Sequence, residues 1–212
     1  MPATINAIAA LAATLTLGAL PGCSSGGGHA ASSGAAAPVV DSASGFAGAA
    51  LPGGYAALPD LTLHDEAGAR VALSALHGHV AIIAFVYSTC GQPCTVIAHQ
   101  IRGALDDLGG AVPMLIVSAD PAADTPASVR AFLSRVGLRG RVRYLTGSRA
   151  QLAAAWRAFH VVPPSGGRAA FARSAPVYVL DRAGRPRVIF QLEQLTPEGL
   201  AHDVRAVQRE RR

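Results

Sequence analysis

Two apolar segments stand out in the hydropathy pattern of the chain, VAIIAFVY at residues 80–87 and PMLIVS at residues 113–118. Unbroken β-favouring runs of this length are typical of strands covered on both sides in a parallel sheet. Between them, residues 93–108 repeat apolar side chains with helical spacing, including Ile97 and Ile101. Strand, helix and strand in this order predict a βαβ unit.

Turn and cap residues divide the rest of the domain into short elements. Helices are predicted after Thr125, Ser148 and Thr196, because each of these residues is a good N-cap. The expected strands are at 60–64, 69–73, 142–146, 176–180 and 186–190. This order predicts an α/β fold whose central mixed sheet is flanked by helices, with an N-terminal hairpin. Trp156 and Phe159 are assigned to the core.

The first 22 residues are expected to be a signal peptide. Their apolar run, residues 5–20, is short for a bilayer span and is followed by Pro21, Gly22 and Cys23. Residues 20–23 resemble the bacterial lipoprotein box, in which the cysteine carries the lipid, and Ser24 then favours the outer membrane. The alternative is an ordinary cleaved signal with Cys23 lost or free. Both interpretations predict export into a bacterial cell envelope.

Composition separates a tether from a folded domain. Residues 23–56 are rich in Gly, Ala and Ser without an apolar face, which predicts a flexible, lipid-anchored tether. The domain is expected to span residues 57–210 and to face the periplasm.

Charge and residue usage exclude several functions. All 18 basic residues are arginine, so no lysine is available for a Schiff base or a P-loop. Residues 1–129 hold 2 arginines and 8 acidic residues, whereas residues 130–212 hold 16 arginines and 5 acidic residues. Only 5% of the chain is aromatic, so a nucleic-acid surface is not expected. A solvated basic face is the simplest interpretation, and an anionic membrane or an acidic partner fits the same charge.

The chain has three cysteines, and lipidation of Cys23 leaves the pair Cys90 and Cys94. The pair lies where a buried strand gives way to a helix, and the positive end of a helix dipole favours a thiolate. Residues i and i+4 of a helix are about 6 Å apart, within reach of a disulfide. We therefore expect a pair that opens and closes reversibly, with a static structural disulfide as the alternative.

Three segments resemble the SCO/SenC family, which has a thioredoxin fold and is associated with cytochrome c oxidase assembly and copper handling. They are FVYSTCGQPC at 85–94, VSADPAADTP at 117–126 and Leu145-Thr146-Gly147. The resemblance covers nearly all of residues 57–209 and implies a thioredoxin-like fold. It also implies copper binding by Cys90, Cys94 and a distant histidine. Asp124, in the second segment, is interpreted as an acid that supports the start of a helix.

The chain departs from this family at the histidine position, where Arg173 stands. Arginine has no lone pair to donate, so copper(I) would be left with two thiolates, and His160 is the best replacement ligand. Arg173 is interpreted either as stabilising a Cys90 thiolate or as an exposed surface residue. Pro176, after Ala175, matches the cis-proline that thioredoxins place against their disulfide, and by resemblance it shapes a substrate groove.

These features favour a membrane-tethered thiol-disulfide redox protein that needs no cofactor, in which Cys90 attacks and Cys94 resolves the mixed disulfide. By resemblance, its clients are copper-site cysteines of a cytochrome c oxidase subunit or a copper chaperone. One alternative is a copper(I)-binding metallochaperone that uses the same two thiolates. A second is a module that binds assembly partners without turnover. The redox direction stays open.

Overall fold

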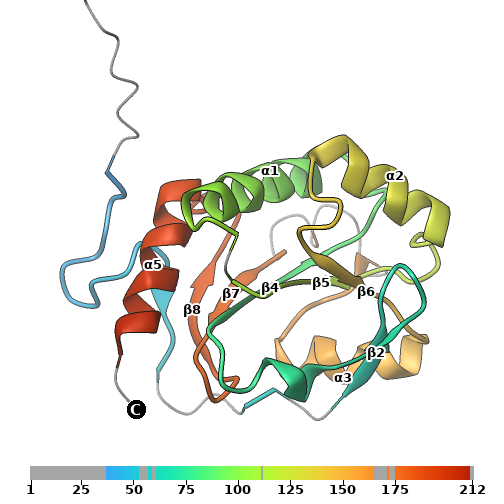
Figure 1. The fold of residues 1–212 in the computed structure, drawn as a ribbon, viewed down its shortest axis with the longest axis horizontal. Helices are drawn as coiled ribbons and strands as arrows, with labels where there is room; N and C mark the ends of the chain where they lie inside the picture. The colour runs from blue at the N-terminus through green and yellow to red at the C-terminus, as the bar shows by residue number, and fades with distance from the viewer. Residues whose placement is uncertain are drawn as a thin grey trace, which may run out of the picture. The chain divides into compact units, whose positions relative to one another are not determined.

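The computed structural model describes residues 37–52, 57–58, 61–110, 112–164, 171 and 175–210, which belong to one compact unit, Ala35–Arg212. The main sheet contains β1 (Ala49–Ala50), β4 (Ala81–Val86), β5 (Met114–Ser118), β6 (Arg143–Leu145), β7 (Val177–Leu180) and β8 (Pro186–Phe190). Its strand order is β1-β8-β7-β4-β5-β6 (Figure 1). A separate hairpin pairs β2 (Thr62–His64) with β3 (Arg70–Ala72).

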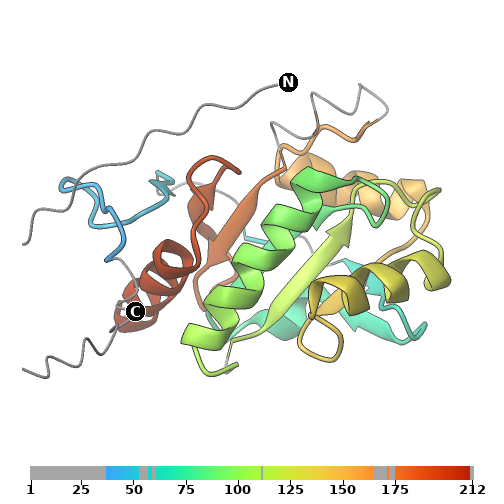
Figure 2. The ribbon, with the colours of Figure 1, turned by 90° about the horizontal axis from the view of Figure 1, so that it is seen from above.

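Four α-helices in the described residues pack against this sheet. They are α1 (Gln92–Asp107), α2 (Pro126–Val136), α3 (Arg149–Ala158) and α5 (Pro197–Arg209), together with the short 3-10 helix η1 (Leu73–Leu76). Helices α1 and α2 cover one face, α5 packs beside α1, and α3 lies on the opposite face (Figures 1 and 2). The side chains of Thr125, Ser148 and Thr196 accept N-cap hydrogen bonds, as their sequence positions predict.

The centre of the sheet is as apolar as the sequence predicts. Every residue of β4 and β5 is buried, because α1 and α2 cover one face while α3 covers the other. An aromatic cluster extends this core, with ring centroids 5.2 Å apart for Phe85 and Phe159 and 5.0 Å apart for Phe159 and Tyr178. The indole of Trp156 donates to the Ser118 carbonyl at 3.0 Å. Trp156 and Phe159 are therefore core residues, as expected.

Strand directions bring several connections to one edge of the sheet. Strands β4, β5 and β6 are parallel, so their carboxyl ends meet at the same edge. Strand β7 is antiparallel to β4 and therefore begins at that edge. The loop before α1, the segment before α2 and the entry into β7 all lie there. Residues far apart in sequence thus converge where the cysteine pair is found.

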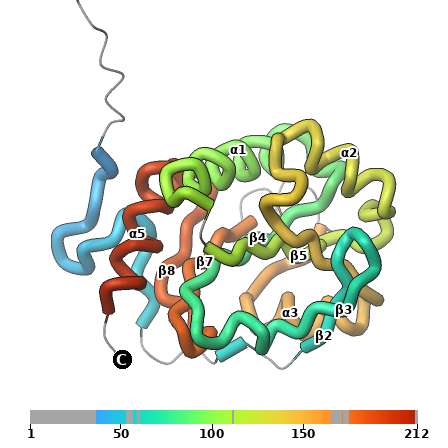
Figure 3. The backbone as a smooth tube through the Cα atoms, viewed as in Figure 1, coloured from blue at the N-terminus to red at the C-terminus, as the bar shows by residue number. Residues whose placement is uncertain are grey.

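The packed part of the chain begins before residue 57, where the sequence predicts the domain to start. Phe46 is buried, and β1 pairs with β8 in the segment predicted to be tether. Figure 3 shows this segment, in blue and cyan, running beside α5. The buried carboxylate of Asp203 on α5 accepts hydrogen bonds from the amides of Ala47 at 2.8 Å and Gly48 at 2.9 Å. Backbone hydrogen bonds and small side chains hold this segment, so it has no apolar periodicity that sequence analysis could detect.

Candidate functional site

Cys90 and Cys94 lie at the junction between β4 and α1 and are joined by a disulfide. Their Cα atoms are 5.8 Å apart, within the range that this bond requires. Cys90 ends the loop that leaves β4, and Cys94 is in the first turn of α1. The structure therefore brings these two predicted site residues together.

Local backbone geometry explains how the pair is placed. The amide of Cys90 donates to the Tyr87 carbonyl at 3.1 Å, which closes a tight turn directly after β4. Gly91 then adopts a φ of +84°, a conformation that L side chains rarely adopt, and serves as the N-cap of α1. No side chain caps this helix start. The positive end of α1 therefore faces the disulfide without a competing side-chain acceptor, which favours a thiolate after reduction.

The two sulfur-bearing residues differ in exposure. Cys94 is completely buried, whereas Cys90 is only half-buried and is flanked by the exposed residues Thr89 and Gly91. Below them, the buried ring of Tyr87 packs on Phe171 with centroids 5.3 Å apart. An incoming thiol reaches Cys90 more easily than Cys94.

Asp124 supports the cysteine loop from beneath. Its carboxylate accepts hydrogen bonds from the Ser88 amide at 2.6 Å, the Ser118 hydroxyl at 2.6 Å and the Tyr144 hydroxyl at 2.7 Å. The sequence interpretation of Asp124 as a helix-start acid is therefore wrong, because the N-cap of α2 is the Thr125 side chain and Asp124 is buried with 4% exposure. Its location within VSADPAADTP, next to the buried end of β5, was the available signal for this role.

Tyr144 and Ser128 complete this polar network. Burial, followed by the neighbouring Asp124 carboxylate, raises the pKa of the Tyr144 phenol well above its usual value. Tyr144 therefore remains a hydrogen-bond donor at neutral pH. The Ser88 hydroxyl donates to the Ser128 hydroxyl at 2.9 Å, which ties the cysteine loop to α2 as well.

Pro176 is buried directly before β7, at the same edge of the sheet. Its carbonyl accepts a hydrogen bond from the Phe85 amide at 3.3 Å, near the end of β4 from which the cysteine loop leaves. Its predicted part in a substrate groove remains a prediction. Arg173 and Cys23 lie outside the described residues.

His160 terminates α3. It is exposed with a φ of +52°, its amide donates to the Arg157 carbonyl, and the Val161 amide donates to the Trp156 carbonyl at 2.8 Å. This pattern is a Schellman motif with histidine in the position that glycine usually occupies. Within the described ranges, no three His, Cys, Asp or Glu side chains form a group that could hold a metal. The structure therefore does not gather His160 with the cysteine pair into such a group.

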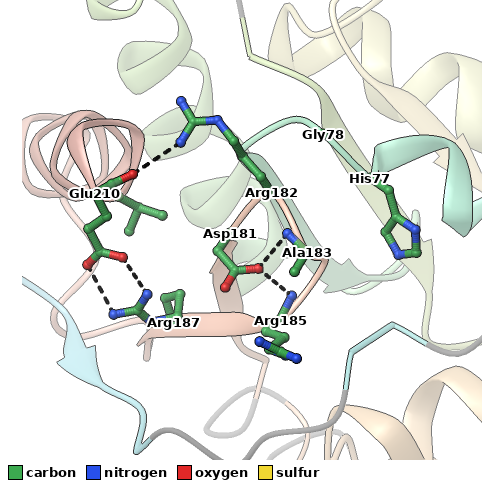
Figure 4. A pocket seen from close by; sticks show the side chains of 9 residues that line it. His77, Gly78, Asp181, Arg182, Ala183, Arg185, Arg187 and Glu210 are labelled. Atoms are coloured by element: carbon green, nitrogen blue, oxygen red, sulfur yellow. Dashed lines mark hydrogen bonds and ion pairs between the residues drawn. The ribbon is translucent and has the colours of Figure 1, made fainter. Parts of the chain in front are cut away.

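A pocket of about 630 Å³ lies at the opposite edge of the sheet, beside the turn between β7 and β8 (Figure 4). Arg187 forms an ion pair with Glu210, and Arg182 donates to the Gln208 carbonyl at 3.0 Å, near the end of α5. These contacts fix the end of α5 against the turn. No cysteine lines this pocket, and the Cys90–Cys94 disulfide lies at the other edge of the sheet.

No described helix is both long enough and apolar enough to span a bilayer. The apolar run at residues 5–20 lies outside the described residues.

Comparisons with solved structures support the fold. The chain is 28% identical to Bradyrhizobium japonicum ScoI with copper bound, over 72% of this chain and 99% of that one, with a TM-score of 0.55. It is 20% identical to BsSco, for which a disulfide switch is described, over 76% of this chain and 99% of that one, with a TM-score of 0.64. A SCO1/SenC family lipoprotein from Bacillus anthracis is 17% identical over 73% of this chain and 96% of that one, with a TM-score of 0.60. The predicted thioredoxin-like fold is thereby confirmed.

No curated protein matches the chain. The SCO1/SenC family model matches residues 51–209, which is most of the chain and includes the whole sheet except β1. The chain therefore belongs to the SCO1/SenC family.

Proposed function

We propose that this protein takes part in assembling the copper site of cytochrome c oxidase by exchanging its Cys90–Cys94 disulfide with copper-site cysteines of a client. The observation that carries the proposal is the asymmetry of the pair. A half-buried Cys90 stands next to a fully buried Cys94 at the uncapped start of α1. This arrangement provides one sulfur for attack and a second sulfur to complete the reaction.

In the reducing direction, the Cys90 thiolate attacks one sulfur of a client disulfide. The client bond breaks, its other sulfur leaves as a thiolate, and a mixed disulfide forms. The Cys94 thiolate then attacks Cys90 Sγ, closes the intramolecular disulfide and releases the client dithiol. Two electrons and two protons pass from this dithiol to the client, and a dithiol protein of the cell envelope restores the starting state. Pro176 shapes the groove beside the exchanging sulfurs.

The family and the copper-bound relative favour copper(I) binding as the second candidate function. Reduction of the disulfide supplies two soft thiolates, which suit copper(I). Arg173 occupies the position where the family has a histidine, so the sequence offers His160 as a third ligand, although the structure does not gather it with the two cysteines. In this alternative, copper(I) is cargo that the protein delivers to the oxidase.

Export and a lipid anchor on Cys23 are part of the proposal. They are supported by the lipoprotein-box sequence and by the description of the Bacillus anthracis relative as a lipoprotein. In cells supplied with a labelled fatty acid, the wild-type chain should take up the label and Cys23→Ser should not. Equal labelling of both forms would contradict the anchor.

The exchange proposal is tested by mixing the reduced full chain with an oxidised copper-site domain of a cytochrome c oxidase subunit. We expect wild type to release the client thiols and Cys90→Ser to be inactive. Cys94→Ser should stop at a covalent adduct, because nothing resolves the mixed disulfide. Cys23→Ser is the control and should retain exchange. Release no faster than with free glutathione, or full activity of Cys90→Ser, would refute the proposal.

Copper(I) titration of the reduced chain against a competing chelator tests the alternative. One tightly held copper(I) in wild type, lost in both Cys90→Ser and Cys94→Ser, would favour delivery of the metal over exchange alone. The His160→Ala variant reports separately on the third ligand, and its affinity should fall only if the imidazole binds the metal.

A further inference from the structure

The Asp124 network is the strongest feature that the proposed exchange reaction does not use. Asp124 is almost fully buried, and its two oxygens accept three hydrogen bonds of 2.6 to 2.7 Å. One donor is the backbone amide of Ser88, two residues before Cys90. Burying a carboxylate costs free energy unless its oxygens are hydrogen-bonded. Its presence next to the cysteine loop therefore indicates a specific role.

The three donors come from different parts of the sheet. Ser88 is in the loop after β4, Ser118 ends β5, and Tyr144 is in β6. Asp124 therefore joins the carboxyl ends of three parallel strands at the edge where the disulfide lies. All four β5 residues that precede Ser118 are buried, so one side of this connection is a rigid core element.

The hydrogen bonds around Asp124 restrict the backbone between the core and Cys90. Ser88 is held through its amide by Asp124 and through its hydroxyl by Ser128 at 2.9 Å. The next fixed point is the Cys90 amide, which donates back to the Tyr87 carbonyl. Only Thr89 separates these two fixed residues. The hydrogen bonds of Ser88 and of the Cys90 amide, on either side of Thr89, therefore fix the position of Cys90 relative to α1 and to Cys94.

We propose that Asp124 is a positioning residue that sets the dithiol-disulfide equilibrium of Cys90 and Cys94 by holding the cysteine loop in the geometry of the closed bond. The inference rests on the proposed redox function of the pair but concerns a different property. Preorganised groups react as if present at high effective concentration. A loop held in place before the bond forms stabilises the disulfide relative to the dithiol. Loosening it should favour the dithiol.

A purely structural role would give a different result, and the chain contains a comparator. Asp203 is also buried, and it accepts hydrogen bonds from the amides of Ala47 and Gly48 and contacts the His202 ring at 2.9 Å. The amides belong to the β1 segment and His202 belongs to α5, so these partners lie outside the cysteine loop. Loss of Asp203 should therefore weaken the fold without changing the disulfide equilibrium.

The experiment equilibrates the full chain, in a Cys23→Ser background, with mixtures of reduced and oxidised glutathione at neutral pH. In the reaction measured, the protein disulfide and two glutathione thiols give the protein dithiol and one glutathione disulfide. Two electrons and two protons move to the protein sulfurs. The dithiol fraction is read by alkylation and mass shift in wild type, Asp124→Asn, Tyr144→Phe and Asp203→Asn, and thermal melts confirm that each variant is folded.

We expect Asp124→Asn to shift the equilibrium toward the dithiol by about tenfold, the effect of losing one hydrogen bond to a charged group. Tyr144→Phe keeps the carboxylate and its other two donors, so its shift should be about threefold in the same direction. Asp203→Asn should stay within about twofold of wild type despite a lower melting temperature.

The proposal is overturned if Asp124→Asn stays within about twofold of wild type, or if Asp203→Asn shifts the equilibrium as much as Asp124→Asn does. If Asp124→Asn fails to fold, Tyr144→Phe serves as the test, because an unshifted dithiol-disulfide equilibrium in that variant also contradicts the proposal. Glutathione is the probe here, so absence of client exchange would refute the proposed function while leaving this inference standing.

Discussion

Two buried carboxylates, Asp124 in the loop before α2 and Asp203 on α5, accept backbone hydrogen bonds from different segments of the chain. Asp124 holds the loop between β4 and α1, and Asp203 holds the segment that enters β1. Both accept backbone amides, and both are almost inaccessible to solvent. The partners differ, because Asp124 also accepts two side-chain hydroxyls whereas Asp203 takes backbone amides and one imidazole contact.

A buried carboxylate therefore has a different role at each of the two positions. At Asp203, the carboxylate replaces the apolar contacts that a segment of Ala and Gly cannot make, so it fixes where the chain joins the fold. At Asp124, the segment already leaves a buried strand, and the carboxylate fixes the orientation of the loop. The Asp203 contacts attach the β1 segment to the fold, whereas the Asp124 contacts hold the loop that carries Cys90.

Replacing either carboxylate by leucine should have the largest effect on stability. Both Asp124→Leu and Asp203→Leu leave buried amides without acceptors, so each should lower the free energy of unfolding by about 3 kcal/mol in denaturant titrations. Hydrogen exchange then separates the two regions. Asp203→Leu should expose the amides of Ala47 and Gly48 while the Ser88 amide stays protected, and Asp124→Leu should do the reverse. Loss of protection in both regions in either variant would mean that the two contacts form one unit.

An intermediate effect is expected at Gly48, on the Asp203 side of the comparison. A Cβ atom there would lie 2.7 Å from Val188 Cγ1 and 2.9 Å from the Ile189 carbonyl oxygen. Gly48→Val should therefore displace the β1 segment and cost about 2 kcal/mol, measured by denaturant titration. Ala49→Val is the control, because Ala49 is exposed in β1. Equal stability of the two variants would show that the segment is not held closely against β8.

The smallest effect is expected from Tyr144→Phe, on the Asp124 side. Loss of one hydroxyl donor should cost about 1 kcal/mol at neutral pH. The raised pKa of folded Tyr144 means that the folded state keeps its proton while the unfolded tyrosine ionises near a pKa of about 10. Its contribution to stability is therefore fully present below that pH and declines as the pH rises further.

Chemical denaturation of wild type and Tyr144→Phe at several values of pH checks this linkage. The stability difference between the two proteins should narrow above a pH of about 10, because only wild type has the proton to lose at this position. A difference that stays constant up to strongly alkaline pH would show that the hydroxyl is not held as a donor to Asp124.

The elements with local signals were predictable from the sequence. The helix at α1 follows the spacing of Ile97 and Ile101, and β4 and β5 are apolar throughout, so these elements lie where the pattern places them. The β1 strand was missed because it has two residues and its stability comes from Asp203, more than 150 positions away. A charged residue on the apolar face of α5, between Leu200 and Val207, was the one sequence signal of that contact.

The candidate site was predictable only in part, because some of its contacts join residues that are far apart in the sequence. The spacing of Cys90 and Cys94, and their position at the predicted start of a helix, were enough to pair these two residues. The role of Asp124 depends on Ser88, 36 residues earlier, and on Tyr144, 20 residues later. Its place beside the true N-cap, Thr125, supplied a plausible local explanation that the tertiary contacts replace.

The short β1 strand also has a consequence for self-association. Strand β8 carries the apolar, β-favouring segment Val188–Phe190, and without β1 its outer backbone groups would be open to pairing with another chain. The two alanines of β1 pair with this edge of β8 and make it inaccessible to another chain. Their small side chains add little apolar surface. The β1 segment thereby protects this edge of the sheet against pairing with other copies of the chain.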